Sequence, residues 1–275
     1  MSKTHNKPYS PKIDIVIPIY GKFDFLRECL NAIPDSVGDI DYKVILVDDA
    51  SPDKIEANRF FTAFEEENKF KSYEVARLSQ NSGYPGACNH GASKGNSPII
   101  CILTTDVLMD KGSIKLLYNE MINDDTIGSI GPLLTFVENT PHGPVGKVQH
   151  AGLDMDVHGN VVHTFIGWDP KNPKVQKRSE VFALTGALFL TRRNLWHMVN
   201  GFSQDYGRGT YEDVEYALTI KSMGYKIIYE PKATGSHFVG ASVIQDKKGY
   251  DLNRNKQILD AKCSRFYEWT QWKRW

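Results

Sequence analysis

Asp106 stands just beyond an apolar run, Pro98 to Leu103, that predicts a buried strand. The carboxylate therefore lies where this strand leaves the core. Such a carboxylate can bind a divalent cation, because Mg²⁺ often takes one or two carboxylates and fills its other positions with water and phosphate oxygens. A lone aspartate at a strand end is more often a turn or cap residue, so its position relative to other polar residues decides between the two roles.

A pair of acids, Glu212 and Asp213, opens a segment with helical spacing that ends near Gly224. One of them can serve as a general base, which must lie within hydrogen-bond reach of an incoming hydroxyl. Thr210 and Asp213 also fit a capping box, in which the acid only satisfies backbone N–H groups. The local sequence leaves both roles open.

Two other positions carry groups that bind ligands. His237 lies eight residues beyond the predicted strand Tyr225 to Tyr229, and imidazole can complete a metal shell, although an isolated histidine is usually a surface or core residue. Asp48 and Asp49 end another predicted strand, where a carboxylate can accept hydrogen bonds from a ribose or a base N–H. The alternative is an acidic turn that caps the following helix.

The segment 81–87 (NSGYPGA) looks like a phosphate-binding loop. It lacks both GxGxxG and GxxxxGK[ST], so it supports neither a dinucleotide fold nor a P-loop. Its glycines instead permit a tight, ligand-facing turn before a helix that carries Asn89.

The elements that must position these residues alternate between strands and helices. Strands are predicted at 13–19, 43–47, 73–78 and 98–103, and helices from about residue 24 until Pro34 stops the first, at 54–69, 81–94 and 112–123. This alternation predicts right-handed crossovers and a mainly parallel sheet in an α/β fold. Such sheets bind ligands beyond the carboxyl ends of their strands, where Asp48, Asp49 and Asp106 all fall.

The pattern loosens over residues 138–180. This segment holds four of the eight histidines at irregular spacing that does not indicate a zinc site, and a hairpin is predicted to turn at 158–160. With Thr185 and Gly186 after it, the segment is expected to shape one side of a ligand site. Trp168 either stacks on a ligand there or is simply packed.

Composition excludes several classes of protein. The chain has 275 residues, 41% hydrophobic and 24% charged, which is ordinary for a globular protein. Lys+Arg and Asp+Glu both number 33, so no global field attracts nucleic acid. The four cysteines form no CxxC pair, and no apolar run predicts a signal peptide or a spanning helix, so a reduced cytoplasmic setting is expected.

Taken in order, the motifs resemble the inverting family 2 glycosyltransferases of the GT-A fold, across roughly residues 13–240. The matching segments are 15–20 (IVIPIY), 47–51 (VDDAS), 81–83 with 87–91, 185–190 (TGALFL), 201–202 (GF), 211–215 (YEDVE) and 224–237. The segment 148–152 (VQHAG) is similar to one in bacterial members that build surface polysaccharides. The resemblance implies a mainly parallel, Rossmann-like sheet flanked by helices, with a small antiparallel portion on the acceptor side.

The resemblance also implies roles by position. Asp213 corresponds to the catalytic base, with Glu212 beside it, and Asp106 and His237 correspond to metal or diphosphate contacts. The implied donor-side positions are Pro18, Tyr20, Asp48, Asp49, Asn81, Gly83, Asn89 and Thr105. The acceptor side is assigned to Thr185, Gly186 and Trp168.

One departure concerns the metal. The family commonly has Asp or Asn at the first position of its metal motif, and this chain has Thr104. We therefore expect Mn²⁺ or Mg²⁺ to bind well only together with the donor, and metal independence stays an alternative.

The expected reaction is transfer of a sugar from a nucleoside diphosphate, with a UDP-sugar as the expected donor, to a hydroxyl of a glycan or lipid-linked saccharide, with inversion. The alternatives are a nucleotidyltransferase and a non-catalytic module that binds sugar nucleotides or glycans.

The expected organisation is a flexible N-terminus (1–12), one GT-A domain (13–240) and an aromatic, basic C-terminal tail (241–275). Three tryptophans at three-residue intervals, Trp269, Trp272 and Trp275, suit a membrane interface at its inner, cytoplasmic face. Docking of the tail onto the domain and pairing in a homodimer are the alternatives.

Overall fold

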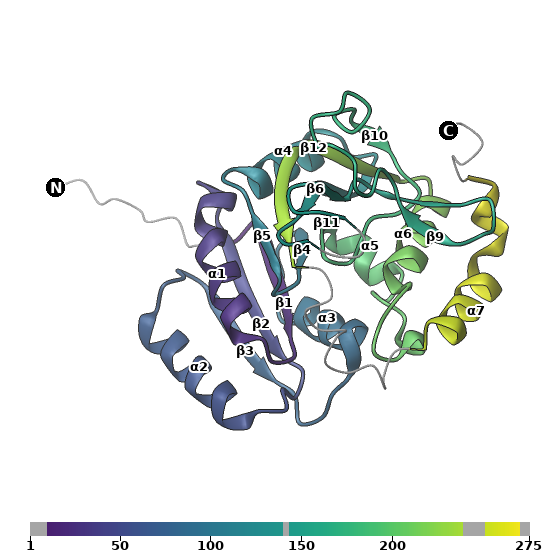
Figure 1. The fold of residues 1–275 in the computed structure, drawn as a ribbon. Helices are drawn as coiled ribbons and strands as arrows, with labels where there is room; N and C mark the ends of the chain where they lie inside the picture. Colours follow the sequence, from purple (N-terminus) through teal and green to yellow (C-terminus); the bar gives the residue numbers. More distant parts are fainter. Residues whose placement is uncertain (1–9, 140–142, 239–250, 270–275) are drawn as a thin grey trace.

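A ten-stranded sheet between two layers of helices forms the frame of the computed structural model, which describes residues 10–139, 143–238 and 251–269 (Figure 1). Its first half contains β1 (Ile13–Ile19), α1 (Phe23–Val37), β2 (Tyr42–Asp48), α2 (Lys54–Glu67), β3 (Tyr73–Arg77), α3 (Gly83–Ser93), β4 (Ile99–Leu103), β5 (Val107–Met109), α4 (Ser113–Asn123) and β6 (Ile127–Phe136). The second half contains β7 (Val148–His150), β8 (Leu153–Met155), β9 (Val161–His163), β10 (Ser179–Glu180), β11 (Leu188–Arg192), α5 (Arg193–Met198), η1 (Gln204–Tyr206), α6 (Glu212–Ser222), β12 (Lys226–His237), α7 (Leu252–Cys263) and η2 (Ser264–Trp269).

The strand order is β10-β12-β6-β11-β4-β1-β2-β3, with β5 on β12 and β7 on β6. The long pairings of β1, β2, β3 and β4 and that of β12 with β6 are parallel, whereas β11 lies antiparallel between β4 and β6. A separate antiparallel pair, β8 and β9, turns at the hairpin predicted for 158–160. The predicted α/β class, with a mostly parallel sheet and a small antiparallel portion, is confirmed.

The period-2 alternation of the strands divides the core into two layers. Ile15 and Ile17 of β1 pack with apolar residues of α1, α2 and α4, whereas Val16 packs on the other face with residues of α3, α5, α6 and α7. Figure 1 shows the same division, with α1 and α2 on one side of the sheet and α3 and α6 on the other. Ligands are therefore admitted only at the strand ends and not through either covered face.

Helix α1 continues through Pro34 to Val37, so the predicted end at Pro34 is wrong. A proline inside a helix lowers the stability of that helix by about 3 kcal/mol, because it removes a backbone hydrogen bond and crowds the preceding turn. The last turn is nevertheless held: Gly38 N donates to Pro34 O at 3.0 Å, and Ser36 Oγ donates to Ile33 O at 2.8 Å. Val37 is fully buried, which is worth about 1.5–3 kcal/mol and offsets most of that cost.

Strand β12 runs to His237, well past the predicted end at Tyr229. Its register with β6 shifts between Glu230 and Thr234, and Pro231 lies in this irregularity, where the lack of a donor N–H is tolerated. The proline interrupted the sequence pattern without ending the strand. The extension places His237 within the sheet rather than in a loop beyond it.

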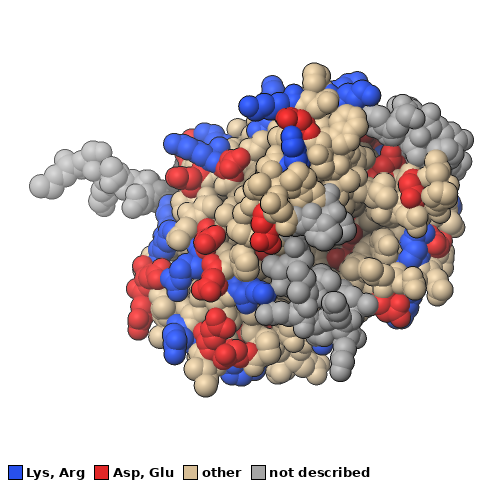
Figure 2. Space-filling view, viewed as in Figure 1, with Lys and Arg blue, Asp and Glu red and all other residues tan. Residues whose placement is uncertain are grey.

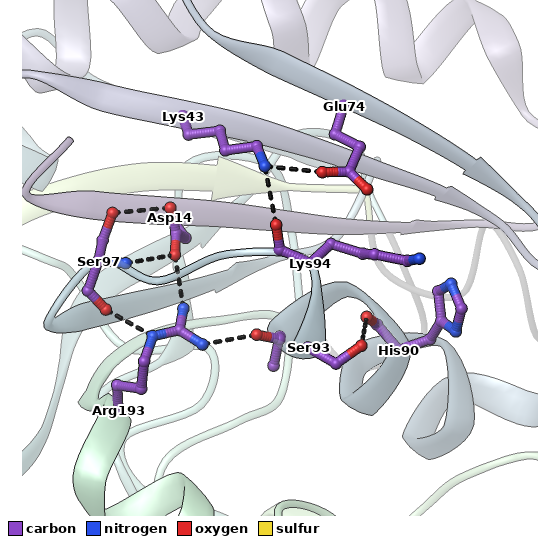
Figure 3. Close-up of polar contacts among 9 residues, drawn as sticks. Asp14, Lys43, Glu74, His90, Ser93, Lys94, Ser97 and Arg193 are labelled. Atoms are coloured by element: carbon purple, nitrogen blue, oxygen red, sulfur yellow. Dashed lines mark hydrogen bonds and ion pairs between the residues drawn. The ribbon is translucent and has the colours of Figure 1, made fainter. Parts of the chain in front are cut away.

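A buried ion pair ties α5 to the amino end of β1, the end of the sheet opposite to the carboxyl ends of the parallel strands (Figure 3). Asp14 is fully buried, and its Oδ2 lies 2.5 Å from the Arg193 guanidinium. Arg193 also donates to the carbonyls of Ser97 and Ala92, each at 2.5 Å, while Asp14 accepts from Ser97 N and Oγ. Each nitrogen of the guanidinium thus donates a hydrogen bond and both oxygens of Asp14 accept one, which stabilises a buried pair.

Asp14→Asn is expected to lower the free energy of unfolding by about 3–5 kcal/mol, because the Arg193 guanidinium stays buried without its counter-charge. Urea unfolding followed by circular dichroism measures the change. Lys71→Ala is the control, since the side chains of Lys71 and its partner Asp41 are 69% and 50% exposed and such a pair contributes little. A loss in Asp14→Asn no larger than in the control would contradict the role of the buried pair.

The outer surface carries charges of both signs. Figure 2 shows Lys and Arg side chains intermixed with Asp and Glu over the viewed face, in keeping with the zero net charge. Among the residues that the structure describes, none of the helices has the length and apolar character needed to cross a bilayer. Trp272 and Trp275 of the predicted aromatic tail lie outside the described residues.

Candidate active site

The register of β5 and β12 brings Asp106 and His237 together. Asp106 directly precedes β5, and His237 pairs with Val107 at the start of that strand. Phe238 N donates to Asp106 O at 3.0 Å, and His237 Nε2 lies 3.5 Å from Asp106 Oδ1. Two side chains 131 positions apart in the sequence thus meet at one end of the sheet.

Asp106 is only 6% exposed, yet it favours the charged form. Burial raises the pKa of this carboxyl, but hydrogen bonding and charge interaction with His237, and a hydrogen bond from Thr104, outweigh burial and hold the pKa below its usual value. His237 is oriented in turn by Gln149, whose Oε1 lies 3.1 Å from His237 Nδ1. A hydrogen bond between Nδ1 and Gln149 fixes the imidazole ring so that Nε2 faces Asp106.

Asp106 and His237 can together supply two ligands to a divalent cation, whose other ligands would come from other groups. A carboxylate and an imidazole nitrogen are suitable ligands for such an ion, and the hydroxyl of Thr104 beside them is a weak one. Within 10–139, 143–238 and 251–269, no group of three or more His, Cys, Asp or Glu side chains is placed to hold a metal ion. An ion held by Asp106 and His237 would need phosphate oxygens and water as its other ligands.

Asp213 is held by two backbone donors. Its Oδ2 accepts from Gly186 N at 2.7 Å and its Oδ1 from Val214 N at 2.8 Å. The capping-box alternative is wrong, because Tyr211, in a left-handed conformation with no side-chain cap, precedes α6, and the hydroxyl of Thr210 accepts instead from Asn255. One oxygen of Asp213 thus accepts from the first turn of its own helix, and the other ties it to Gly186 in a different segment of the chain.

Burial shifts both acids toward the protonated form. Burial raises the pKa of Asp213 to about 6, against the lowering effect of the N–H groups of Gly186 and Val214. Burial, followed by the charge of Asp213, raises the pKa of Glu212 well above its usual range. Glu212 Oε2 is buried without a hydrogen-bond partner among the described residues. The charge of Asp213 raises the pKa of Glu212, so Asp213 is the acid of the pair that ionises first as the pH rises.

The raised pKa of Glu212 predicts that the stability of the folded protein depends on pH. A carboxyl whose pKa is raised in the folded protein contributes stability below its unfolded pKa, and this contribution disappears as pH rises through the folded pKa. Glu212→Gln cannot ionise, so its Tm relative to the wild type is expected to increase from about pH 5 to about pH 9. For a chain of this size, each unit by which folding raises the pKa of Glu212 corresponds to a Tm difference of about 3–5 °C between the variant and the wild type.

Thermal unfolding of both proteins over that pH range measures the difference. Glu66→Gln, on the exposed face of α2, is the matched control and should follow the wild type at every pH. A Tm difference between Glu212→Gln and the wild type that does not change with pH would contradict the buried, protonated state.

Asp48 and Asp49 lie at the end of β2, and neither caps the next helix, since Asp53 does. Asp48 Oδ1 accepts from Ser51 N at 2.8 Å, and its Oδ2 lies 3.1 Å from Arg77 Nε. Each oxygen of the Asp48 carboxylate therefore already has a partner within the protein.

Asp49 reaches the turn before α3. Its Oδ1 accepts from Ser82 N at 2.7 Å and from Ser82 Oγ at 2.8 Å, while Asn81 Nδ2 donates to Asp49 O. Burial raises the pKa of Asp49 in spite of these hydrogen bonds. Gly83 follows at φ 75°, and a Cβ there would lie 2.2 Å from Gly207 O, so the turn requires glycine.

The other donor-side positions differ in their surroundings. Pro18 pairs with Val47 near the end of β1, and Tyr20 lies just beyond it, with its ring centre 5.9 Å from the Arg208 guanidinium carbon. Thr105 is 5% exposed, immediately before Asp106. These three positions lie at the same end of the sheet as the carboxylates.

Asn89 lies on α3, and both ends of its side-chain amide are bonded to one residue. Its Nδ2 donates to Phe202 O at 2.7 Å and its Oδ1 accepts from Phe202 N at 2.9 Å. This pairing holds α3 against the segment after α5, and it gives Asn89 a structural role that the sequence pattern did not indicate.

The segment Thr185 to Ala187 joins the two acidic centres. Thr104 N donates to Ala187 O at 2.9 Å, and Gly186 N donates to Asp213, so this segment lies between Asp106 and Asp213. Tyr84 OH donates to Gly186 O at 2.5 Å from the donor-side turn.

A buried histidine, His150, contacts the segment Thr185 to Ala187 through the N–H of Thr185. His150 is fully buried, its Nδ1 lies 3.1 Å from His163 Nδ1, and its Nε2 faces Gly152 N at 3.3 Å and Thr185 N at 3.5 Å. Burial, and then the charges of His163 and His237, lower the pKa of His150 well below its usual value. His150 is therefore a neutral acceptor at physiological pH.

Trp168 lies apart from these contacts and is 42% exposed, with its ring centre 5.1 Å from that of Phe165. Trp168 is therefore packed on Phe165 in part and open to solvent in part, and its role on the acceptor side stays a prediction. Gln149 and Tyr84 contact the site residues but were not predicted as site residues. The VQHAG resemblance was the signal available for Gln149, and the glycine-containing turn at 81–87 was the signal available for Tyr84.

Comparison with known proteins agrees with this geometry. The sequence matches the family model described as Glycosyl transferase family 2 over residues 14–197. An O-antigen biosynthesis protein of Myxococcus xanthus is 22% identical over 85% of this chain and 18% of its own length. The chain spans half or less of the length of the curated relatives it matches.

Two solved structures share the fold. GalNAc-T7 with UDP, GalNAc and Mn²⁺ has a TM-score of 0.67 at 17% identity, covering 82% of this chain and 43% of that one. The mannosyltransferase PcManGT of Pyrobaculum calidifontis, in complex with GDP-Man and Mn²⁺, has a TM-score of 0.61 at 19% identity, covering 92% and 69%. These likenesses establish a GT-A architecture, and because the family match extends over most of the chain, the protein belongs to glycosyl transferase family 2.

Proposed function

We propose that the chain transfers a sugar from a nucleoside diphosphate sugar to a hydroxyl of a saccharide or lipid-linked acceptor, with inversion at the anomeric carbon. The observation that carries the proposal is the buried Asp213 carboxylate. Its pKa of about 6 suits a base that works near neutral pH, and Gly186 N fixes one of its oxygens. The segment Thr185 to Ala187 links this base to the Asp106–His237 pair.

In the proposed reaction, the acceptor oxygen attacks the anomeric carbon while the bond from that carbon to the diphosphate oxygen breaks. The acceptor proton passes to the Asp213 carboxylate, and the bonding electrons leave with the diphosphate. Attack opposite to the leaving group inverts the configuration, so one base suffices and no second carboxylate is needed as a nucleophile. The raised pKa of Glu212 favours its protonated form and thereby favours a charge on Asp213 as the base.

Asp106 and His237 would hold a divalent cation together with the donor diphosphate, with Gln149 fixing the imidazole. When bound, such an ion neutralises charge that develops on the departing diphosphate. Asp106 is suited to this because its lowered pKa keeps it ionised over the working pH range.

The donor is proposed to lie across the ends of β1 and β2, between Tyr20 and the turn at Asn81 to Gly83. Asp49 is the acid there that is tied to this turn through Ser82. UDP and GDP-Man occupy the two solved GT-A relatives, which supports a nucleotide-sugar donor, and a UDP-sugar is the proposed form. The name of the O-antigen relative supports a saccharide acceptor in polysaccharide assembly, for which the exposed Trp168 offers an aromatic face.

The test is a panel of nucleotide sugars with Mn²⁺ or Mg²⁺, followed by identification of the released nucleotide. Release of nucleoside diphosphate, with a thermal shift for the same donor, supports the proposal. Release of pyrophosphate would indicate a nucleotidyltransferase instead. Binding of a donor without turnover in the wild type and in Asp213→Asn alike would indicate a non-catalytic sugar-nucleotide module.

A further inference from the structure

The loop of residues 206–211, directly before the acidic pair, has a strained backbone. Gly209, Thr210 and Tyr211 have φ values of 131°, 84° and 72°. Two of these residues are not glycine, and such residues keep a left-handed conformation only where their surroundings hold them in it. Because α6 begins after Tyr211 with no side-chain cap, the loop itself sets the direction of the first turn, which carries Glu212 and Asp213.

One side chain from α7 holds this loop. Asn255 is 2% exposed, and its Nδ2 donates to Tyr206 O at 3.0 Å, Gly209 O at 2.8 Å and Thr210 Oγ1 at 3.0 Å. Two of these acceptors are carbonyl oxygens, which cannot donate, so the amide nitrogen rather than the oxygen must face them. A single amide thus joins both ends of the strained stretch.

Helix α7 is itself fixed on both sides of Asn255. Arg254 donates to Asp205 O at 2.9 Å, and Lys262 Nζ lies 2.6 Å from Asp205 Oδ2 and 3.1 Å from Glu215 Oε2. Figure 1 shows α7 beside α6 at the far side of the molecule from α1. The amide of Asn255 is therefore presented to the loop from a supported position.

The same loop contacts the donor-side turn. Gly207 O is the atom that a Cβ on Gly83 would meet at 2.2 Å, and Tyr84 N donates to Arg208 O at 3.1 Å. On its other side, a Cβ at Gly209 would lie 3.8 Å from both carboxylate oxygens of Glu212. A displacement of the loop would therefore move the acidic pair and the donor-side turn relative to each other.

We propose that Asn255 is a positioning residue, which acts from α7 through the 206–211 loop to hold Glu212 and Asp213 in their working geometry. This role rests on the proposed function, because it concerns the base of that reaction. Misplacement of a catalytic group by about 1 Å can cost about 100-fold in rate. Loss of the three hydrogen bonds is therefore expected to reduce kcat more than it raises the KM for the donor.

The test compares Asn255→Ala and Asn255→Asp, which removes the donor hydrogens at nearly constant shape, with the wild type. Both variants are expected to lose about 10- to 100-fold in kcat, with the donor KM changed by about twofold or less. The acid limb of the kcat–pH profile is expected to move to lower pH, because a loosened loop admits water to the buried Asp213. Hydrogen exchange of the 206–211 amides, measured by mass spectrometry, is expected to rise by about 10-fold or more.

Leu259→Ala is the matched control, since Leu259 is a fully buried residue of the same helix with no hydrogen bond to the loop from its side chain. It is expected to lower Tm without changing the pH profile or the loop exchange. Equal losses of kcat in Leu259→Ala and Asn255→Ala at equal Tm would overturn the proposal, because Asn255 would then act only on stability. A wild-type chain that turns over no donor would overturn the proposed function, whereas wild-type turnover with unchanged loop exchange in Asn255→Ala would overturn only the role of Asn255.

Discussion

Asp213→Asn is expected to lower kcat for sugar transfer by about 10²- to 10⁴-fold, the usual contribution of a general base. Asparagine keeps the shape of the side chain, and its oxygen can still accept from Gly186 N, which donates to Asp213 at 2.7 Å. The donor dissociation constant is expected to change little, because the Asp106–His237 pair is untouched. Steady-state kinetics together with calorimetric titration of the donor measure the two effects separately.

The pH dependence provides a second measure of the same group. Only the ionised carboxylate accepts a proton, so wild-type kcat is expected to rise with pH through about 6, the pKa to which burial raises Asp213. This limb should be absent from the residual activity of Asp213→Asn. If the base were an ordinary, exposed aspartate, the rise of kcat with pH would occur about two pH units lower.

Glu212→Gln is the comparison for this prediction, since Glu212 is the adjacent acid and is even less exposed to solvent than Asp213. A larger loss of kcat in Glu212→Gln than in Asp213→Asn would transfer the role of base to Glu212. Turnover of Asp213→Asn within about twofold of the wild type would contradict the assignment, given the 10²-fold minimum expected of a base.

Much of the frame follows from local patterns. Apolar runs such as Ile13 to Ile19 are buried on both faces, so they read as strands, and the alternation with helices fixes a largely parallel sheet. Once the sheet is parallel, Asp48 and Asp106 must lie at its carboxyl edge, because they follow β2 and β4. That step needs no knowledge of tertiary contacts.

The contacts that make the site specific depend on register and on distant segments. His237 reaches Asp106 only because β12 continues past Pro231 through an irregularity, which a pattern of alternating residues does not show. Asn255 approaches Thr210 from a helix that follows the acidic pair by about forty residues, and no local spacing connects them. The capping box at Thr210 failed for the same reason, since its hydroxyl was claimed by a tertiary partner.

The second large effect is expected at the Asp106–His237 pair. Asp106→Ala is expected to reduce Mn²⁺-dependent affinity for the nucleotide-sugar donor by about 100-fold or more, because even outer partners of metal ligands are worth about 10- to 100-fold. The Asp106 carboxylate lies 3.5 Å from His237 Nε2, and Thr104 beside it offers just a hydroxyl. Titration of the donor with and without chelator measures the metal-dependent part.

Asp110→Asn is the matched control, an exposed acid of the same segment whose Oδ2 accepts from Thr234 rather than facing His237. It should keep both the affinity and its dependence on the ion. Thr104→Asp adds the carboxylate that the metal motif lacks, and it is expected to let Mn²⁺ alone raise Tm, which the wild type should show only weakly without donor. Donor affinity that is equal in wild type and Asp106→Ala, and that chelator leaves unchanged in both, would contradict the metal role, because an ion shared between Asp106 and the diphosphate must couple the two.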